Sequence, residues 1–524
     1  MAELAVSSTD TVKLIQPQAV IARANTAVTA FIGRALKGPV NQPVAIYSFE
    51  DYPRVFGGLW QPSTLSYAVE QFFESGGEQC VVVRVCNGGR APTLRLAAGT
   101  DVLSLIGVAP GTREFLRASV DYDGIAPQET DRFNLVVQRV RSPGSELIEE
   151  QEIFRRVSIL PGMERNLLDV LSESRLVRLH GAVPPERPVP SASPAGGAGY
   201  TWSNADGDDG DPLSNYDIIG DASRGTGLFA LRASELPFNF LNVPPLTRDS
   251  DVGLPALLVA LRACREHQAM LLLDPPVDWS DAANATRQLG GWPFFSEDAL
   301  MFYPRIVALD RLRGREEIFA PAATAAGLIA QGAHRCPVWS ASADDELVLR
   351  PGARLAALVS DVDRVRLAQG GVNVLNLVRT NARPRLGLRT LLREAACKSD
   401  WRYAAARRLA LFVTTSIEQG TRWALFETPG PPLWQQLSAQ VTAFFEALHD
   451  DGAFVGRSAE ENYFVICDER LNCVAPGGAA GVQLVFGVAL CRPGDFHTCL
   501  VHHCVGGSSV RAVSVNRYAL PRHR

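Results

Sequence analysis

The sequence predicts a mixed α/β protein of several domains, and three observations carry this prediction. Strands and helices alternate over residues 26–88 and again over 216–400, whereas residues 89–180 carry short alternating strands. Residues 401–490 contain two amphipathic helices near the carboxyl end. At 524 residues, the chain is long enough for about three or four domains. We therefore expect an α/β core and an inserted antiparallel β domain.

The composition limits the classes of function. Hydrophobic residues make up 46% of the chain and charged residues 20%, which is typical of a folded domain. The net charge of −5 gives no basic field for a nucleic-acid partner. The ten cysteines form no CxxC pair, which favours assembly in a reducing cytoplasm. Neither a signal peptide nor an apolar run of about 20 residues is present, so no membrane insertion is expected.

Residues 1–25 form the predicted N-terminal arm. Their apolar residues are isolated and follow no helical stripe. Such a segment suits a strand that is added to a neighbouring sheet, although a frayed terminus explains it equally well. The subunit-contact candidates in this arm are Val12, Leu14, Ile15, Val20 and Ile21.

Residues 26–88 predict the first part of the α/β core. Val28–Gly33, Val44–Ile46 and Cys80–Val85 are apolar runs of strand length. Ser63 can cap a helix whose buried stripe begins at Leu65. No GxxxxGK[ST] motif follows Gly57 and Gly58, so that glycine pair predicts a plain turn.

Two regions of different character follow. Residues 89–180 predict a β-rich insertion, since Leu94–Leu96, Phe115–Ala118 and Phe133–Arg141 alternate between apolar and polar side chains. Residues 181–215 are rich in Pro, Gly, Ser and Asp and predict a flexible loop. Four aspartates in this loop could hold calcium, but the EF-hand glutamate is missing and a hydrated loop is the simpler interpretation. They are Asp206, Asp208, Asp209 and Asp211.

Residues 216–400 return to alternating strands and helices. Leu254–His267 predicts a helix, and Met270–Leu273 predicts a buried strand that ends in Asp274 and two prolines. An acid at the carboxyl end of such a strand is a position that α/β enzymes use. No GxSxG or HExxH motif completes a site. A structural role for Asp274, at the point where the two prolines end the strand, is therefore favoured over catalysis. We expect no catalytic residue, no cofactor and no metal.

Residues 401–490 predict a helix, a short strand and a second helix. Tyr403, Ala406, Ala410, Val413 and Ile417 recur at helical spacing, and Gly420 ends that helix. Trp423–Phe426 predicts a buried strand, and 433–448 predicts the second helix. Further alternating strands are predicted at 463–467 and 482–489.

The last segment, residues 491–524, gathers cysteine and histidine. Cys491, His497, Cys499, His502, His503 and Cys504 could suggest zinc, which takes four such ligands. Neighbouring residues on an extended strand point to opposite faces, so a buried β-arm is favoured over a zinc site. Phe496, Cys499 and Val501 are further subunit-contact candidates.

Two long blocks of this sequence resemble contractile tail sheath proteins. One reads AFIGRALKGPVNQPVAIYSFEDYPRVFGGLWQPSTLSYAVEQFFESGGEQCVVVRV, and the other RRLALFVTTSIEQGTRWALFE followed by GAFVG and EENYFVICDERLN. The resemblance covers most of the chain except about 180–215 and the final residues. The stretches Pro337–Leu349 and Thr380–Arg385 depart from the family's usual signature, which leaves their local loop structure open.

The resemblance implies a structural subunit of a phage tail or contractile injection system. Such subunits stack as hexameric rings around an inner tube, contact baseplate and terminator proteins, and contract from a metastable extended state. The resemblance also implies a subtilisin-like core without its catalytic triad, a peripheral position for residues 89–180, and extended N- and C-terminal β-arms that link subunits. Alternatives are a minor sheath paralogue at the baseplate or cap end and an α/β hydrolase using Asp274. The protein would assemble in the cytoplasm and belong to a particle.

Arg402, Arg407 and Arg408 lie off the apolar stripe of the helix after 401. One hypothesis is that they contact the tube or the next ring. A solvated helix face explains them equally well.

Overall fold

The structure is a computed structural model that describes residues 20–191, 199–340, 347–377, 387–393, 400–472, 481–504 and 506–514. Its described residues form two compact units. The larger unit comprises residues 26–337 and the described part of 341–404. The smaller unit comprises residues 20–25 and 338–340 with the described residues from 405 onward. The finer domain boundaries expected from the sequence stay predictions.

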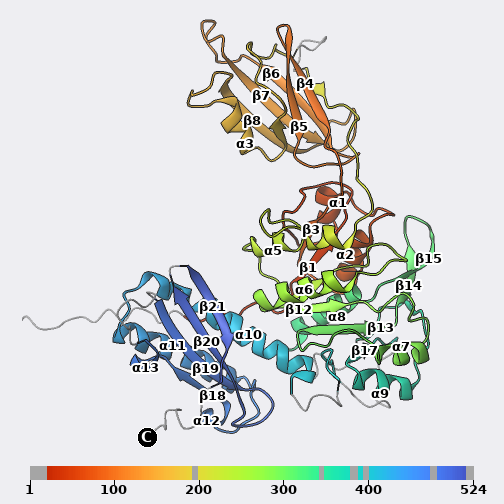
Figure 1. The fold of residues 1–524 in the computed structure, drawn as a ribbon, viewed down its shortest axis with the longest axis vertical. Helices are drawn as coiled ribbons and strands as arrows, with labels where there is room; N and C mark the ends of the chain where they lie inside the picture. The colour runs from red at the N-terminus through yellow and green to blue at the C-terminus, as the bar shows by residue number, and fades with distance from the viewer. Residues whose placement is uncertain are drawn as a thin grey trace, which may run out of the picture. The chain divides into compact units, whose positions relative to one another are not determined.

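A seven-stranded sheet runs through the larger unit (Figure 1). Its strand order is β17-β13-β12-β11-β1-β3-β2, and all neighbours are parallel except β2, which is antiparallel to β3. Most of these strands are fully buried, as parallel strands covered on both faces must be. The strands are β1 (Thr29–Gly33), β2 (Val44–Ile46), β3 (Cys80–Arg84), β11 (Phe240–Asn242), β12 (Met270–Leu273), β13 (Ala299–Tyr303) and β17 (Val372–Val374).

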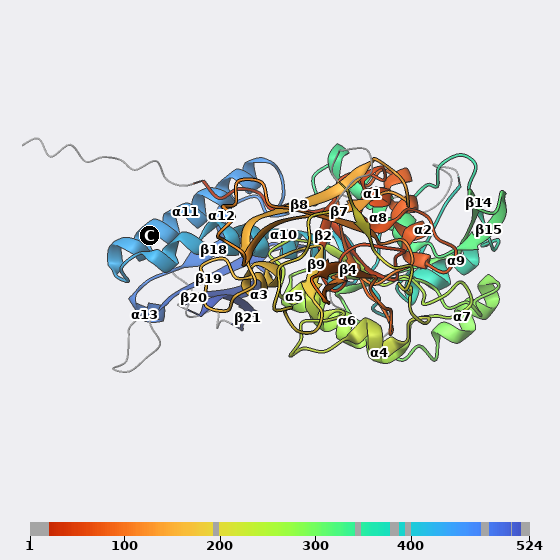
Figure 2. The ribbon, with the colours of Figure 1, turned by 90° about the horizontal axis from the view of Figure 1, so that it is seen from above.

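Helices cover both faces of this sheet. Figure 2 shows α2 and α8 on one side of the strands and α4 and α6 on the other. The Ser63 hydroxyl accepts a hydrogen bond from the Ser66 N–H at 3.1 Å and starts α2, as the sequence predicts. The helices are α1 (Asp51–Phe56), α2 (Thr64–Glu74), α4 (Asn215–Ile219), α5 (Phe229–Arg232), α6 (Leu254–Glu266), α7 (Ala282–Leu289), α8 (Ala322–Arg335) and α9 (Asp361–Gln369).

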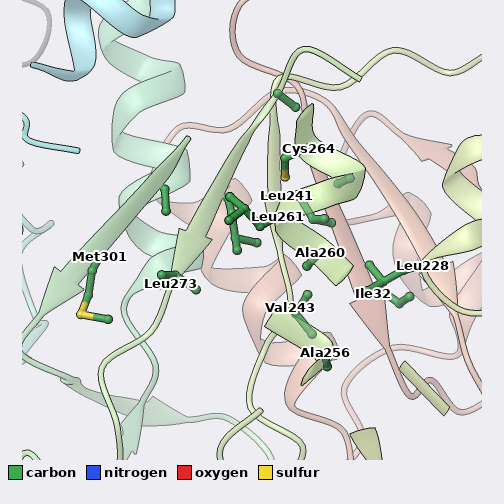
Figure 3. Close-up of a cluster of buried hydrophobic side chains, with 14 of the residues drawn as sticks. Ile32, Leu228, Leu241, Val243, Ala256, Ala260, Leu261, Cys264, Leu273 and Met301 are labelled. Atoms are coloured by element: carbon green, nitrogen blue, oxygen red, sulfur yellow. The ribbon is translucent and has the colours of Figure 1, made fainter. Parts of the chain in front are cut away.

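The core on the α6 side follows from the pleat of the strands. Ile32, Leu241 and Leu273 alternate with neighbours that face the other way, and all three belong to the same buried cluster as the inward side chains of α6 (Figure 3). Small residues on that helix, Ala256 and Ala260, let it approach the sheet closely. On the opposite face Phe31 meets Phe72 of α2 edge to face at 5.5 Å.

The predicted β-rich insertion is present as two antiparallel sheets, β10-β6-β7-β8 and β4-β5-β9. Their inward side chains share one core, with Leu105, Leu116 and Phe133 among its members. The elements are β4 (Thr93–Ala98), β5 (Asp101–Gly107), β6 (Phe115–Asp121), β7 (Arg132–Val140), β8 (Ile148–Ser158), α3 (Leu167–Ser172), β9 (Val177–Leu179) and β10 (Thr201–Trp202).

A small antiparallel sheet, β15-β14-β16, completes the larger unit. Its strands are β14 (Ile306–Asp310), β15 (Arg315–Phe319) and β16 (Arg354–Leu355). The fully buried Asp310 ties this sheet to α2, because its carboxylate accepts hydrogen bonds from Gln61 and Tyr67 at 3.0 and 3.1 Å.

The smaller unit packs helices on a four-stranded antiparallel sheet of order β18-β19-β20-β21. Val413, Phe445 and Phe486 meet in its core, which joins the two long helices to the sheet. The elements are α10 (Ala404–Gly420), η3 (Arg422–Phe426), α11 (Pro431–Asp450), α12 (Ala459–Asn462), β18 (Tyr463–Ile466), α13 (Glu469–Asn472), β19 (Gly481–Ala489), β20 (Phe496–Cys504) and β21 (Gly507–Ala512). A 3₁₀ turn, η2 (Asp400–Arg402), belongs to the larger unit.

The predicted strand at Trp423–Phe426 is wrong, because these residues lie in the 3₁₀ helix η3. Only Ala424 of this helix is buried, whereas Phe426 is 90% exposed. The Trp423 Nε1–H donates to Gln440 Oε1 of α11 at 3.0 Å. This tight turn closes the short connection between two helices that already cover the sheet.

Residues 199–215, part of the predicted flexible loop, make specific contacts. Thr201 and Trp202 pair with β6. Asp206 accepts hydrogen bonds from the Thr93 N–H and hydroxyl, and Asp209 does the same for Thr112. These carboxylates therefore bond to protein N–H and O–H groups, which a reading of the composition alone does not anticipate. Residues 192–198 lie outside the described residues.

Candidate assembly surfaces and the pocket at Asp274

The described end of the N-terminal arm packs on the smaller unit. Ile21 is 4% exposed and lies in the core with Val413 and Ile417 of α10. The Ala24 N–H donates to the Ser416 hydroxyl at 3.0 Å. Val20, in contrast, is 90% exposed. The other arm candidates, Val12, Leu14 and Ile15, lie outside the described residues.

The four-stranded sheet of the smaller unit has β18 at one edge and β21 at the other. An edge strand leaves a row of N–H and C=O groups that an added strand can pair with. The residues on β21 alternate between exposed and partly buried until its exposed end. Both features suit strand addition by an arm from a second chain.

The C-terminal contact candidates occupy the two faces of β20. Cys499 is 3% and Val501 0% exposed, and both lie in the core beneath α10 and α11. Phe496 is partly buried on the opposite face, where its ring meets Phe464 edge to face at 5.1 Å. A role for these residues in subunit contacts stays a prediction.

The cysteine and histidine side chains of β20 contact different partners. His503 is 1% exposed and lies between the hydroxyls of Thr421 and Ser508, at 2.8 and 2.6 Å. His497 Nε2 lies 3.3 Å from Cys499 Sγ. Within the residues that the structure describes, no group of three or more His, Cys, Asp or Glu could hold a metal ion.

The three arginine candidates differ in burial. Arg408 is 5% exposed, so a solvated helix face does not describe it. Arg402 and Arg407 are partly buried, and the Arg402 guanidinium lies 5.1 Å from the centre of the Tyr403 ring. A contact of these residues with a tube or a neighbouring ring stays a prediction.

Asp274 lies at the carboxyl end of β12, as the sequence predicts. Its Oδ1 accepts from the Ala322 N–H at 2.7 Å, and its Oδ2 lies 3.4 Å from Asn242 Nδ2. Burial raises the pKa of Asp274 to about 6. The described lining of the pocket beside it includes the hydroxyl side chains of Thr64, Tyr67 and Thr247 but no serine or histidine.

Two residues have contacts that the sequence patterns do not indicate. Gly420 ends α10 and also receives the Ile21 side chain. Asn242 is a buried amide at the end of β11, and a polar residue within the apolar run LNVPP was the available signal. None of the helices in the described part of the chain is long and apolar enough to cross a membrane.

The described residues define a class of protein: a mixed α/β chain of two compact units, with a seven-stranded sheet in one and a four-stranded antiparallel sheet in the other. Comparison with solved structures identifies proteins of the same fold. The sheath tail protein Lin1278 from Listeria innocua matches with a TM-score of 0.56 and 13% identity, over 94% of this chain and 96% of that one.

Two contracted sheaths match over similar lengths. The helical sheath of the anti-feeding prophage gives a TM-score of 0.51 at 16% identity, over 94% of this chain and 96% of that chain. The PVC sheath complex of an extracellular contractile injection system gives 0.50 at 15% identity, over 94% and 97%. No protein-family model and no curated protein matches the chain. The chain therefore has the fold of sheath proteins, and a subtilisin-like core stays an expectation.

Proposed function

We propose that the chain is a structural subunit of a contractile sheath, in a phage tail or a contractile injection system. The observation that carries this proposal is the shared fold over nearly the full length of solved sheath proteins, two of them from contracted assemblies. The two sequence blocks that resemble this family lie at opposite ends of the chain and support the same reading.

The proposed mechanism needs self-assembly rather than catalysis. Subunits would stack as hexameric rings around an inner tube, with baseplate and terminator proteins at the ends. Arms would keep neighbours connected while compact units move as rigid bodies. The extended state would be kinetically trapped, and contraction would release the energy stored on assembly. Cytoplasmic assembly followed by function in the particle fits this role.

The described end of the arm segment supports linkage between copies. Ile21 anchors the chain on the smaller unit, and the apolar candidates Val12, Leu14 and Ile15 precede this anchor in the sequence. A strand added at β18 or β21 would gain main-chain hydrogen bonds without requiring a particular side chain. The non-enzymatic assignment rests on the same fold, which this chain shares with structural sheath proteins.

The test is negative-stain electron microscopy of the purified full-length chain, a chain lacking residues 1–25, and a matched pair of variants. The first variant combines Val12→Ser, Leu14→Ser and Ile15→Ser; its control combines Ser7→Ala, Ser8→Ala and Thr9→Ala. We expect striated hollow tubes from the full chain and the control, and only rings or monomers from the truncation and the apolar-to-serine variant.

If every chain stays a discrete monomer at high concentration, the result would contradict the proposal that this protein self-assembles. A minor paralogue at the baseplate or cap would then become the leading alternative, because such a protein needs a partner to assemble. Loss of hydrolytic activity in Asp274→Ala would favour the α/β hydrolase, whereas unchanged assembly of that variant would favour the sheath.

A further inference from the structure

We propose that the β-rich insertion, residues 89–212, is a hinged domain that a set of buried ion pairs holds in one position against the α/β core. The ion pairs that cross from core to insertion form a latch, and their release lets the insertion turn about its connection to the core without unfolding. The inference concerns the larger unit alone and does not depend on the proposed sheath function.

The insertion has a hydrophobic core of its own. Its buried apolar cluster, which includes Leu105, Leu116 and Phe133, draws every described member from residues 94–183. The cluster around Ile32 and Leu241 beneath α6 contains none of these residues. These two clusters therefore do not join the insertion to the core. Domains that lack a large apolar interface move relative to one another unless other contacts hold them.

The connection between insertion and core has the features of a hinge. The chain enters the insertion through residues 86–90 and leaves it through 208–212, and the two segments pair with each other. The Asp211 N–H donates to the Asn87 carbonyl at 2.8 Å, and Asn87 Nδ2 donates to the Pro212 carbonyl at 3.0 Å. Gly88 and Gly210 have positive φ angles of 68° and 74°. Glycine tolerates such backbone angles, so both segments can change direction together.

Charged and polar groups of the core and the insertion bond to one another at this junction. Lys37, on the loop after β1, forms an ion pair with Glu149 of β8, and only 7% and 14% of these two side chains are exposed. Glu114, just before β6, is 5% exposed and accepts a hydrogen bond from the Gly38 N–H at 2.9 Å. The buried Arg84 of β3 donates to the Pro110 carbonyl at 2.8 Å.

The charges on the two sides of the junction are complementary. Arg139 is the cation on the insertion side, and it faces three carboxylates. These are Glu150 at 2.9 Å, Glu114 at 3.7 Å and Glu149 at 3.9 Å. Three carboxylates and one guanidinium leave two negative charges on the insertion, and Lys37 and Arg84 supply two positive charges from the core. The docked position is thus the one in which these buried charges are balanced.

Buried ion pairs favour one geometry without adding much stability. The attraction between the two charges roughly offsets the hydration that they lose on burial, so the docked and released positions differ little in free energy while the pair is intact. Removal of one partner leaves the other charge buried and unpaired, which is strongly unfavourable. In the released position that charge regains water. A change to a single charge therefore shifts the population between the two positions.

The experiment is single-molecule Förster resonance energy transfer in the full-length chain. An azide-bearing residue replaces Glu50 beside α1 and Asp101 at the start of β5, because both positions are exposed, and each carries one dye. The labelled chain is diluted among unlabelled chains, so that transfer occurs within one molecule. We expect one dominant transfer efficiency in the natural sequence. Lys37→Met and Glu149→Gln should each increase a second population at least about ten-fold.

A double variant and a matched control separate the latch from a general loss of charge. The chain that carries both Lys37→Met and Glu149→Gln has neither charge left unpaired in that contact. Its second population should therefore be smaller than that of either single variant. The control is Glu129→Gln, which removes a carboxylate that pairs with Arg156 at 2.5 Å inside the insertion. It should leave the distribution of transfer efficiencies unchanged.

An unchanged distribution in both single variants, with native circular dichroism, would overturn the proposal, because packing at the junction would then hold the insertion. Hydrogen exchange of β6 and β7 provides the second measurement. These strands should stay protected in every variant. If they lose protection together with the change in transfer, the charges maintain the fold of the insertion rather than its position, and the proposal fails. Neither result bears on tube formation, so this failure is distinguishable from failure of the proposed function.

Discussion

Gly420 receives the side chain of Ile21 so closely that a β-carbon at Gly420 would lie 2.9 Å from both Cγ1 and Cγ2 of Ile21. Ile21 is 4% exposed, and Gly420 is the last residue of α10. The end of the N-terminal arm is therefore seated on a position where only glycine leaves room. The glycine that ends the helix therefore also accommodates Ile21 of the N-terminal segment.

Gly420→Ala should lower the free energy of unfolding by about 1–2 kcal/mol, because overpacking outweighs the gain in helix propensity. Urea unfolding of the smaller unit's signal measures this change. Ile21→Ala removes the clash, so a double-mutant cycle should show a coupling of at least about 0.5 kcal/mol. Additive effects of the two substitutions would contradict the described contact.

Arg84 is 1% exposed and donates to three carbonyls: its Nε to Ala35 at 3.0 Å, its Nη1 to Gly38 at 2.6 Å and its Nη2 to Pro110 at 2.8 Å. Arg84→Met leaves these acceptors without donors and should destabilise the larger unit by about 3–5 kcal/mol. Chemical unfolding measures the loss. Arg90→Met, at an exposed arginine, is the control and should change stability by less than about 0.5 kcal/mol.

His503 is held as a neutral imidazole. Thr421 Oγ1 donates to the Ile417 carbonyl at 2.6 Å, so it accepts from the His503 Nε2–H, and Ser508 donates to Nδ1. Burial lowers the pKa of His503, with Glu418 opposing that shift and Arg422 and His502 adding to it. The unfolded chain therefore binds a proton at higher pH than the folded chain does.

Stability of the smaller unit should consequently fall as the pH drops below 6.5, the ordinary value for histidine. Burial lowers the pKa of His497 to about 4. The loss of unfolding free energy that His497 causes therefore continues down to about pH 4, where it reaches at most about 3 kcal/mol. Urea unfolding between pH 7 and 4 tests this slope. His503→Gln should flatten it, whereas the control His334→Gln, on α8, should not; equal slopes in all three chains would disprove the assignment.

Much of the fold was predictable because its elements have strong local patterns. The apolar runs at Cys80–Val85 and Met270–Leu273 became central strands, and the spacing from Leu433 to Leu448 became α11. Strand order was not predictable, since β1 and β11 pair across about 200 residues and no local signal encodes that contact. The 3₁₀ helix at Trp423 was not predictable from the sequence for a related reason. A short apolar run fits either a strand or a helix, and packing decides between them.

The candidate site was harder to predict than the fold. Asp274 could be located because it follows a buried strand and precedes two prolines. Asn242 and Arg305 reach the same pocket from other strands, and a single sequence gives no sign that three strand ends meet. Similarly, the histidines of β20 suggested a shared ligand, whereas register places His497 and His503 against different partners.

Asp310 provides a pH prediction of opposite sign. Burial alone would raise the pKa of this carboxyl, but hydrogen bonds from Arg248, Arg313 and Gln61 outweigh it and lower the pKa to about 2. Because the pKa of Asp310 is lower in the folded chain, the ionised carboxylate stabilises the fold at pH values above 3.8, the ordinary pKa of aspartate. That stabilisation is lost as the pH falls toward 2. Asp310→Asn should therefore cost about 3–5 kcal/mol at pH 7, since it leaves buried donors and the Arg248 charge poorly matched.

The difference in unfolding free energy between the natural chain and Asp310→Asn should shrink as the pH is lowered below 3.8, because protonation removes the same charge from the natural chain. Guanidinium unfolding at pH 7, 5 and 3 measures this convergence. Asp278→Asn, at an exposed aspartate, is the control and should follow the natural chain at each pH. A constant difference across the whole range would mean that packing, rather than the charge of Asp310, holds the small sheet to α2.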